Sequence, residues 1–554
     1  MAAGSSSLQS QNLIRNRPQS VWTQWLIPSV EDLYFVALFC LLVYTNLSSR
    51  LLNDAGTGWH IRTGQLIAST HKIPHLDPFS SSLNGRQWFA WEWLYDLVVG
   101  SLADHAGLNA VVTFAAFLIA LAFSCALRIL VRRRANIAAA LILTLLATCA
   151  SMIHFFARPH IVSWLFTVLW FEILDSCEVA IEQRDPKFVA ANSLSRRKYL
   201  WLLPLIMLVW VNAHGGFLIG LVLLAIYWTG ALWQWLQARP ERVDDALLRP
   251  RAKRQLRNLS LIGVLSALAT IVNPYGVNLY AHIYSYLSDS FLIGHIDEFQ
   301  SPNFHYIAQK CFAALLLVTI AGLIAGVRRL RLSQSLIILF AIYAGLYASR
   351  NIPISSLLLV LVIGPEVSWK MSDIRTRLRF LVPTNTAGTS RNFFARMDAI
   401  ELTLRGHVWP IAVLGFTGII VASGGKLGSH TLIDARFSPQ RFPVAAVDYI
   451  ESRHLQGPTF APDNWGGYLI YRLYPTTKLV VDDRHDFYGE AFLRSYLKLI
   501  HAEPGWDDFL REHPANILLV PRDSALESVL ETTTNWRSVY EDDLAVVFVP
   551  GEKR

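Results

Sequence analysis

An acid, an imidazole and a guanidinium stand close together in the stretch NDAGTGWHIRTG, residues 53–64. They are Asp54, His60 and Arg62, and they follow an apolar run that begins near residue 33. A carboxylate at such a place can act as a general base on a hydroxyl group, and burial or a neighbouring cation would tune its pKa. The stretch predicts either an active-site loop with Asp54 as the base or an exposed loop in which Asp54 caps a helix.

Cationic groups stand at the ends of other apolar runs. Arg158 and His160 lie in FARPH, and Arg350 lies in SRN. Arginine binds phosphate through a bidentate fork, so these three residues are candidates for holding a phosphate group. The alternative for each arginine is that it extends to lipid headgroups.

Carboxylates and aromatic rings complete the candidate set. Glu92 stands between two tryptophans in WFAWEW, and Asp297 and Glu298 stand together in IDEFQSP. A sugar could stack on the tryptophans, and two or three of the carboxylates could hold a divalent cation such as Mg²⁺ or Mn²⁺. The predicted substrate-binding residues are Trp59, His60, Arg62, Glu92, His214 and Glu298.

Membrane-spanning helices must position these residues. The 554-residue chain is 53% hydrophobic and 16% charged, whereas soluble domains carry about 25% charged residues. Several apolar runs reach the length that crosses a bilayer. About eleven spans are predicted, at 33–49, 107–130, 136–153, 160–177, 199–213, 217–236, 258–273, 308–327, 333–348, 352–367 and 408–424. The shorter segment 91–103 is predicted to lie at the interface, with Trp88, Trp91 and Trp93 as anchors.

Lys and Arg concentrate in alternate loops. The basic set includes residues 132–134, 184–198, 239–257, 328–331 and 370–405. The positive-inside rule places these loops and the N-terminal tail, residues 1–31, in the cytoplasm. The sequence therefore predicts a multi-pass membrane protein whose polar motifs and C-terminal segment face the outside. The net charge of +8 reflects these loops and does not indicate nucleic-acid binding.

Residues 426–554 change in character and predict a small extracytoplasmic α/β domain. Short apolar runs at 459–462, 478–483, 516–521 and 544–550 alternate with helical patterns, which favours a mostly parallel sheet closed by a hairpin with RSVYED. Loops after parallel strands share one edge, where such sheets bind ligands.

The candidate residues at this edge are Asp463, Trp465, Asp482 and Arg484. Asp463 or Asn464 is predicted to cap the next helix. The alternative is that the charges of DDRHD form structural ion pairs that dock the domain on the membrane part, residues 32–425. The chain contains neither GxGxxG nor a Walker A sequence, which argues against a nucleotide.

This arrangement resembles the GT-C superfamily of polytopic glycosyltransferases, which use polyprenyl-phosphate-linked sugars. The resemblance implies a GT-C-like fold with a catalytic Asp in the first outer loop, here Asp54 in residues 50–106. More narrowly, the chain resembles a group of bacterial membrane proteins with GT-C-like domains. The shared strings are GWHIRTG, DPFS, WEWL, ARPH, NAHGGF, NPYG, GGYLIYRLYP and VVDDRHDFYG. Many superfamily members carry paired acids in this loop. Here Asn53 and Ala55 flank Asp54, so a second acid would have to come from elsewhere, for example from Asp77 or Glu92.

The resemblance implies an inverting glycosyltransferase that uses a polyprenyl-phosphate sugar donor and a glycan, lipid or protein acceptor at the outer membrane surface. Two alternatives stay open at this point. One is a transporter or flippase for lipids or glycans, although the polar motifs lie mainly at span ends. The other is a non-catalytic membrane scaffold whose C-terminal domain binds partners.

Overall fold

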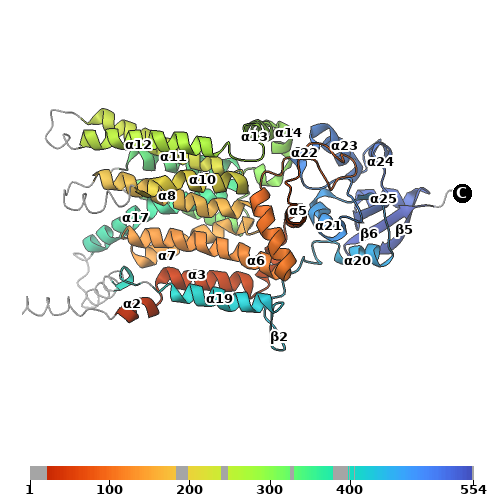
Figure 1. Cartoon of the computed structure of the whole chain (residues 1–554), viewed down its shortest axis with the longest axis horizontal. Coiled ribbons are helices and arrows are strands. Elements are labelled where there is room, and N and C mark those ends of the chain that lie inside the picture. The colour runs from red at the N-terminus through yellow and green to blue at the C-terminus, as the bar shows by residue number, and fades with distance from the viewer. Residues whose placement is uncertain are drawn as a thin grey trace, which may run out of the picture.

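A computed structural model describes residues 21–182, 198–238, 248–324, 330–378, 397, 400–404 and 406–551. Most of the predicted N-terminal tail and of the basic loops at 184–198 and 370–405 lies outside these residues, as does part of the loops at 239–257 and 328–331. The described chain forms a helical bundle that carries a smaller C-terminal region, residues 426–551, at one end (Figure 1). We call the end that meets this region the cavity end and the opposite end the basic end.

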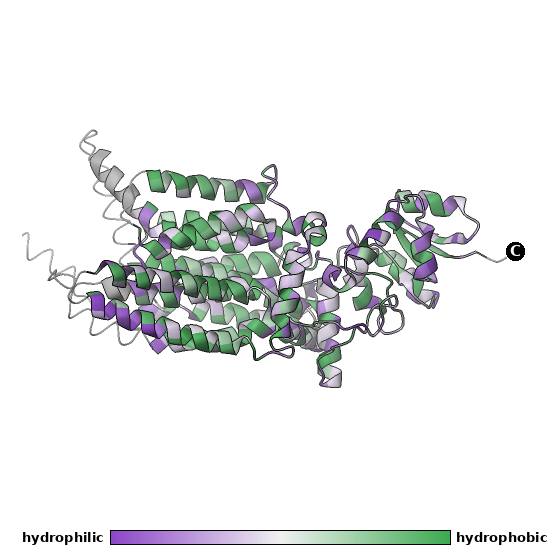
Figure 2. Ribbon diagram, turned by 90° about the horizontal axis from the view of Figure 1, so that it is seen from above, coloured by the Kyte–Doolittle hydropathy of each residue, from purple (hydrophilic) through white to green (hydrophobic). Residues whose placement is uncertain are grey.

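The helices of the bundle follow the apolar runs of the sequence, and hydrophobic residues predominate along them (Figure 2). The α-helices are α2 (Val21–Leu26), α3 (Val30–Val43), α4 (Leu47–Arg50), α5 (Thr57–Thr70), α6 (Trp93–Arg132), α7 (Ile137–Ser151), α8 (His160–Glu182), α10 (Leu202–Ala213), α11 (Phe217–Gln237), α12 (Leu248–Ala269), α13 (Asn278–Ser288), α14 (Ser290–His295), α15 (Ile307–Ile324), α16 (Leu332–Tyr347), α17 (Ile352–Leu378) and α19 (Val408–Ala422). Short 3-10 helices are η1 (Met152–His154), η2 (Lys198–Trp201), η3 (Asp297–Phe299) and η4 (Ser349–Asn351).

Seven helices of the described chain are long and apolar enough to cross a membrane. The count of eleven predicted spans is therefore not confirmed. The predicted spans at 199–213, 333–348 and 408–424 correspond to shorter apolar helices. The span predicted at 258–273 overlaps only the second half of α12, because the first half of this helix is rich in arginine.

The segment before the second span is a separate helix, as predicted. Within α6 the backbone leaves helical geometry at Ala106 and Gly107, where Gly107 has φ 69°. Glycine adopts this conformation without a Cβ penalty, so the chain turns here between a short helix and the long apolar one. The predicted lipid anchors do not face lipid, however. Trp88 is buried, Trp91 lines a cavity, and Trp93 donates a hydrogen bond to Asn212.

The C-terminal region contains two small sheets covered by helices. Its elements are β1 (Lys426–Leu427), β2 (His430–Thr431), α20 (Val444–Ser452), β3 (Thr459–Phe460), α21 (Asp463–Leu473), α22 (His485–Tyr488), α23 (Glu490–Ile500), α24 (Asp507–Glu512), β4 (Ile517–Pro521), α25 (Ala525–Thr532), β5 (Trp536–Glu541) and β6 (Ala545–Pro550). β1 pairs with β2, and the larger sheet has the order β3-β4-β6-β5.

The prediction of a mostly parallel sheet is wrong. Only β3 and β4 run parallel, whereas β6 is antiparallel to both β4 and β5. The predicted hairpin of the last two strands is confirmed. The run at 478–483 contributes only isolated parallel bridges from Leu479 to Ser80 and Thr459, so it lies across the contact with the first loop.

Glycines allow the first loop to approach both of its neighbours. A Cβ on Gly64 of α5 would lie 1.7 Å from the carbonyl oxygen of Asp96, and one on Gly467 of α21 would lie 1.8 Å from that of Ala55. Such distances exclude any side chain at these positions. Helix α5 is thereby fixed between the bundle and the C-terminal region.

Candidate active site

A cavity of about 440 Å³ lies where the bundle, the first loop and the C-terminal region meet. Its polar lining comes from segments far apart in the sequence. The ionisable side chains that line it are Glu92, Asp96, His154, Arg158, His160, His214, Glu298, Arg350, Asp483, Arg484, His485 and Asp486. Of the predicted site residues, Trp59, Glu92, Arg158, His160, His214, Glu298, Arg350 and Arg484 line it.

Asp54 is connected to the cavity by its contact with Arg158. It follows α4, and both its carboxylate oxygens lie 3.3 Å from Nη1 of Arg158, which lines the cavity. The backbone N–H of Gly56 donates to Oδ1 of Asp54 at 2.8 Å, which fixes the carboxylate. Asp54 is not the cap of α5, because Gly56 holds that position. Burial alone would lower the pKa of Arg158, but Asp54 and Glu298 raise it, so the guanidinium stays charged.

A second arginine–carboxylate pair stands in the cavity. Nη1 of Arg350 lies 3.5 Å from Oε1 of Glu298, and its guanidinium lies over the ring of Phe299. Burial alone would raise the pKa of Glu298, but Arg350 and Arg158 lower it to about 2. Both arginines therefore remain cations whose carboxylate partners sit at long distances, as expected of a site that can exchange a carboxylate for a ligand anion.

His160 is placed differently from the prediction. Its Nε2–H donates to the carbonyl oxygen of His154 at 2.8 Å, and its ring packs beside Trp164. His160 lines the cavity, but its Nε2–H is already engaged in the hydrogen bond to His154.

Glu92 lies between two imidazoles. Its oxygens are 3.7 Å from Nε2 of His60 and 3.6 Å from Nε2 of His214. Burial raises the pKa of Glu92 to about 8, against the opposing effect of Arg158. Burial also lowers the pKa of His60, and lowers that of His214 to about 3. At neutral pH Glu92, His60 and His214 are therefore all uncharged. His60 itself is completely buried behind the cavity wall.

Aromatic rings form one wall of the cavity. Trp59 and Trp88 meet edge to face with ring centroids 6.1 Å apart, and Trp91 packs against Tyr286. The Nε1–H of Trp59 points to Oδ2 of Asp483 at 3.4 Å. Indole rings that border a cavity beside hydrogen-bonding groups suit the apolar faces and hydroxyls of a sugar.

Two predicted binding residues point elsewhere. Arg62 donates through Nε to the carbonyl oxygen of Tyr471 at 2.9 Å, so it joins α5 to the C-terminal region. The Nε1–H of Trp465 donates to the carbonyl oxygen of Arg441, and its ring is buried. Their residue types matched a binding role, but their positions in α5 and α21 turn them into packing contacts.

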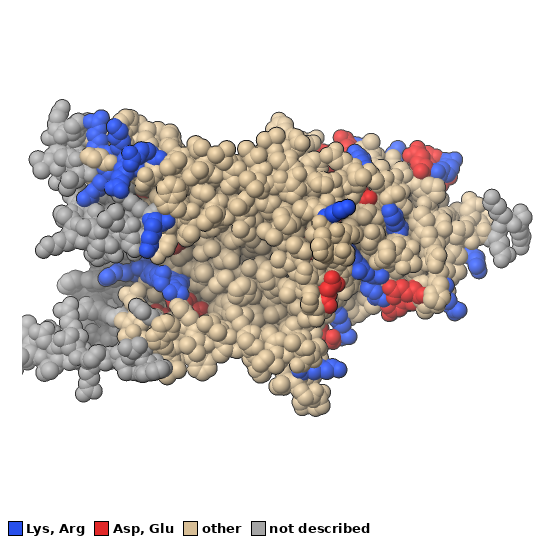
Figure 3. Space-filling model, in the orientation of Figure 1, with Lys and Arg blue, Asp and Glu red and all other residues tan. Residues whose placement is uncertain are grey.

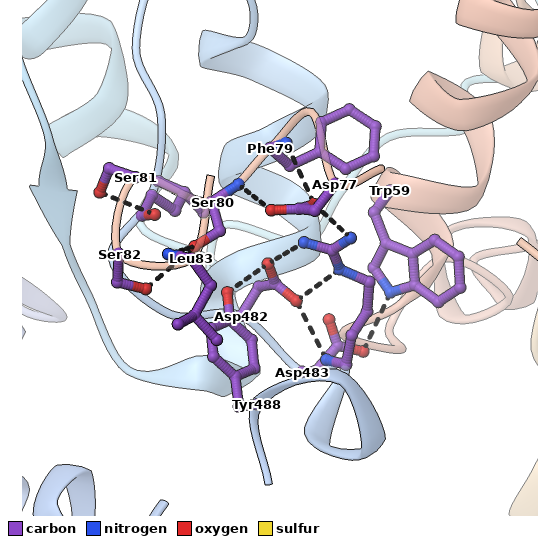
Figure 4. Close-up of polar contacts among 12 residues, drawn as sticks. Trp59, Asp77, Phe79, Ser80, Ser81, Ser82, Leu83, Asp482, Asp483 and Tyr488 are labelled. Atoms are coloured by element: carbon purple, nitrogen blue, oxygen red, sulfur yellow. Dashed lines mark hydrogen bonds and ion pairs between the residues drawn. The ribbon is translucent and has the colours of Figure 1, made fainter. Parts of the chain in front are cut away.

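Arg484 forms a buried bridge between the first loop and the C-terminal region. Figure 4 shows the two carboxylates that it joins, those of Asp77 and Asp482. It donates through Nη1 to Asp77 at 2.7 Å, and through Nε and Nη2 to the two oxygens of Asp482 at 2.8 and 2.7 Å. Trp88 stacks on its guanidinium, with the centroid 4.7 Å away. These contacts match the alternative interpretation of DDRHD, in which its charges form structural ion pairs that dock the C-terminal region on the membrane part. It also means that Asp77 is fully engaged, so it does not serve as a second acid beside Asp54.

Asp483 and His485 face the cavity from the same loop. Burial and then Asp482 raise the pKa of Asp483 to about 7. Nε2 of His485 lies 2.7 Å from Oδ2 of Asp463; although burial alone would lower the pKa of His485, this contact raises it. Asp463 begins α21, whose cap is Pro462, so the predicted capping by Asp463 or Asn464 is wrong.

Sequence reasoning did not select Asp483 as a site residue, although the alternation of side chains along DDRHD offered a signal. Neighbouring residues of an extended segment face opposite sides. If the side chain of Asp482 docks the C-terminal region, the side chain of Asp483 faces the opposite side, toward the cavity. The lining residues His154 and Asp486 were likewise not selected.

The carboxylates do not converge on a metal site in the described part of the chain. No group of three or more His, Cys, Asp or Glu side chains there has a metal-binding arrangement. Glu92 faces imidazoles, whereas Asp54 and Glu298 each face an arginine. The predicted Mg²⁺ or Mn²⁺ therefore has no matching set of ligands among these residues.

No protein-family model matches the sequence, and no curated protein matches it. The fold is similar to solved structures of an oligosaccharyltransferase from Archaeoglobus fulgidus. One is the enzyme tethered through a disulfide bond with an acceptor peptide containing the NVT sequon, with a TM-score of 0.53, 12% identity and coverage of 94% of this chain and 73% of that chain. Another is the oligosaccharyltransferase AglB in complex with an inhibitory peptide and a dolichol-phosphate, with a TM-score of 0.51, 12% identity and coverage of 94% and 74%. These oligosaccharyltransferases are glycosyltransferases of the GT-C type. The chain therefore shares the fold of these oligosaccharyltransferases.

Proposed function

We propose that the chain is an inverting membrane glycosyltransferase that moves a sugar from a polyprenyl-phosphate-linked donor to an acceptor outside the membrane. The observation that carries the proposal is the cavity, which holds two arginines beside an aromatic wall, with Asp54 paired to Arg158, within a GT-C-like fold. The similar archaeal enzyme has been solved with dolichol-phosphate, a lipid phosphate of this class.

The donor phosphate would lie between Arg158 and Arg350. Phosphate oxygens would replace the carboxylates of Asp54 and Glu298 as partners, which their distances of 3.3 and 3.5 Å favour. The sugar would then lie against Trp59 and Trp91. Both tryptophans border the cavity.

The reaction would be a single displacement. The acceptor hydroxyl oxygen attacks the anomeric carbon, the bond from this carbon to the phosphate oxygen breaks, and polyprenyl phosphate leaves with the electron pair. Asp54 takes the hydroxyl proton. When phosphate occupies Arg158, the carboxylate of Asp54 is released from its ion pair and can act as the base. The arginines stabilise the leaving phosphate without any further acid.

The distribution of charge supports the proposed orientation in the bacterial inner membrane. Lys and Arg gather at the basic end of the bundle, and a broad uncharged belt separates them from the cavity end (Figure 3). With the basic end in the cytoplasm, the cavity and the C-terminal region face the outside. We further propose that residues 426–554 form the extracytoplasmic domain and that a glycan, lipid or protein serves as the acceptor.

The test uses the purified full-length protein in lipid with a panel of polyprenyl-phosphate sugars and candidate acceptors. We expect sugar-dependent release of polyprenyl phosphate, and we expect Asp54→Asn to lower its rate by a factor of 10²–10⁴, the range of a lost general base. Asp434→Asn, at an exposed carboxylate, is the matched control and should keep the rate. Equal rates for wild type and Asp54→Asn would remove Asp54 as the base. Protein that is folded but releases no polyprenyl phosphate with any donor would contradict glycosyl transfer and favour transport or scaffolding.

A further inference from the structure

The side chain of Glu92 is a buried carboxyl group with hydrogen-bonding capacity to spare. It borders the cavity, and only 9% of the residue is exposed. In the described part of the chain its nearest polar partners are the two imidazoles, at 3.6 and 3.7 Å. These distances exceed a hydrogen bond. The carboxyl group of Glu92 therefore forms no hydrogen bond with either imidazole.

The two imidazoles are fixed by partners of their own. Nδ1 of His214 accepts the backbone N–H of Gly216 at 3.0 Å, so its proton must sit on Nε2, which faces Glu92. Nδ1 of His60 lies 2.6 Å from Oδ1 of Asp96. Neither ring can turn away, and burial keeps both uncharged. Glu92 thus has no cation in direct contact.

The charges that act on Glu92 come from several elements packed around the cavity. Arg158 precedes α8 and Arg350 lies in η4, and both favour the ionised carboxylate. Glu298 in η3 and Asp486 in α22 oppose it. Burial outweighs all four, so the group carries its proton at neutral pH. Asp483, which also faces the cavity and whose pKa is raised to about 7, titrates near the same range.

We propose that Glu92 is a donor-binding residue that works as a neutral carboxylic acid and gives its O–H to the phosphate of the lipid-linked donor held by Arg158 and Arg350. The inference rests on the proposed function. Phosphate oxygens accept hydrogen bonds, so a protonated carboxyl group adds a donor without adding charge. An ionised Glu92 would instead add like charge beside the phosphate and weaken binding.

The experiment measures binding of polyprenyl phosphate to the full-length protein between pH 7.5 and 9.5, through the fluorescence of the cavity tryptophans. The phosphate is a dianion throughout, because the second pKa of a phosphate monoester is about 6. If the protein binds only when Glu92 is protonated, the protonated fraction of Glu92 falls from about 0.8 at pH 7.5 to about 0.03 at pH 9.5. The Kd for polyprenyl phosphate then rises roughly twentyfold. In Glu92→Gln the amide N–H replaces the acid O–H, so we expect retained affinity and no such rise.

The matched control is Glu401→Gln. Glu401 also has a raised pKa, of about 7, but it contacts Val30 at the start of α3, at the basic end of the bundle. It should keep the wild-type pH dependence. Titration of Asp483 is common to all three proteins and cancels in the comparison.

Each outcome decides a different point. A wild-type Kd that does not change with pH, or the same rise in Glu92→Gln, would overturn the neutral-acid role. A folded Glu92→Gln protein that no longer binds at pH 7.5 would also overturn it, since that result requires a carboxylate. If the wild type binds no polyprenyl phosphate at any pH, both this role and the proposed donor fail. Binding with the expected pH dependence but without sugar transfer would leave Glu92 as a phosphate ligand and reject only the enzyme.

Discussion

At the scale of single residues, the same side-chain type serves different purposes according to its partners. Arg158 and Arg350 each face one carboxylate at a long distance in an open cavity, which leaves room for a ligand. Arg484 is also next to the cavity, but three of its nitrogen atoms are bound to two buried carboxylates. We therefore propose that the first two bind substrate, whereas the third docks the C-terminal region.

Replacing Arg484 tests this assignment. Arg484→Gln would leave Asp77 and Asp482 buried without a cation, and breaking a buried pair typically costs about 3–5 kcal/mol. We expect a lower unfolding temperature and faster proteolysis of the C-terminal region. Arg436→Gln is the control, because its ion pair with Asp434 is largely exposed and worth at most about 1 kcal/mol. Equal stability of the two variants would contradict the docking role.

Residue types predicted much of the site but not its assembly. Arg158, Arg350, Glu92 and His214 were identified because charged or titratable groups at the ends of apolar runs are costly and therefore informative. Arg62 looked equivalent in the sequence, yet it faces Tyr471. Which of these groups converge depends on how α5 and α21 pack, and a single sequence does not contain that information in any local pattern.

At the scale of elements, hydropathy predicted the helices well, because the apolar composition of a segment reflects the burial of that same segment in lipid or protein. Spans and the break near Gly107 follow from composition within one segment. The sheet of the C-terminal region was less predictable. Strand direction depends on partners distant in the sequence, so β6 could pair antiparallel with β4 although the strand–helix alternation favoured a parallel sheet.

The contact between α5 and α21 depends on glycine. Gly467→Ala would place a Cβ within 1.8 Å of the carbonyl oxygen of Ala55, and overpacking of this kind costs about 1–3 kcal/mol. We expect a lower unfolding temperature and weaker polyprenyl phosphate binding, because α21 is pushed away from the first loop. Gly418→Ala in α19 is the matched control. A Cβ there meets no atom within 4 Å, so stability should hold or rise. A Gly467→Ala protein as stable as this control would show that the close approach is not required.

At the scale of the whole molecule, the uncharged belt separates two chemically different ends. We expect a cysteine at Gln440, introduced into a cysteine-free chain, to react with a membrane-impermeant maleimide on intact bacterial cells. A cysteine at Lys253 in α12 should react only after the cells are opened. Both positions are exposed, so access alone decides labelling. The reverse pattern would invert the proposed orientation and place the cavity in the cytoplasm.

The cavity is built from both ends of the chain. Asp54, Glu92 and Arg158 are synthesised early, whereas Asp483 and His485 come more than a hundred residues after Arg350. A nascent chain that has been made only as far as α19 thus has both arginines and the aromatic wall, but one side of the site is still missing. Under the proposed function, unfinished or truncated copies would therefore lack a closed cavity in which to transfer sugar.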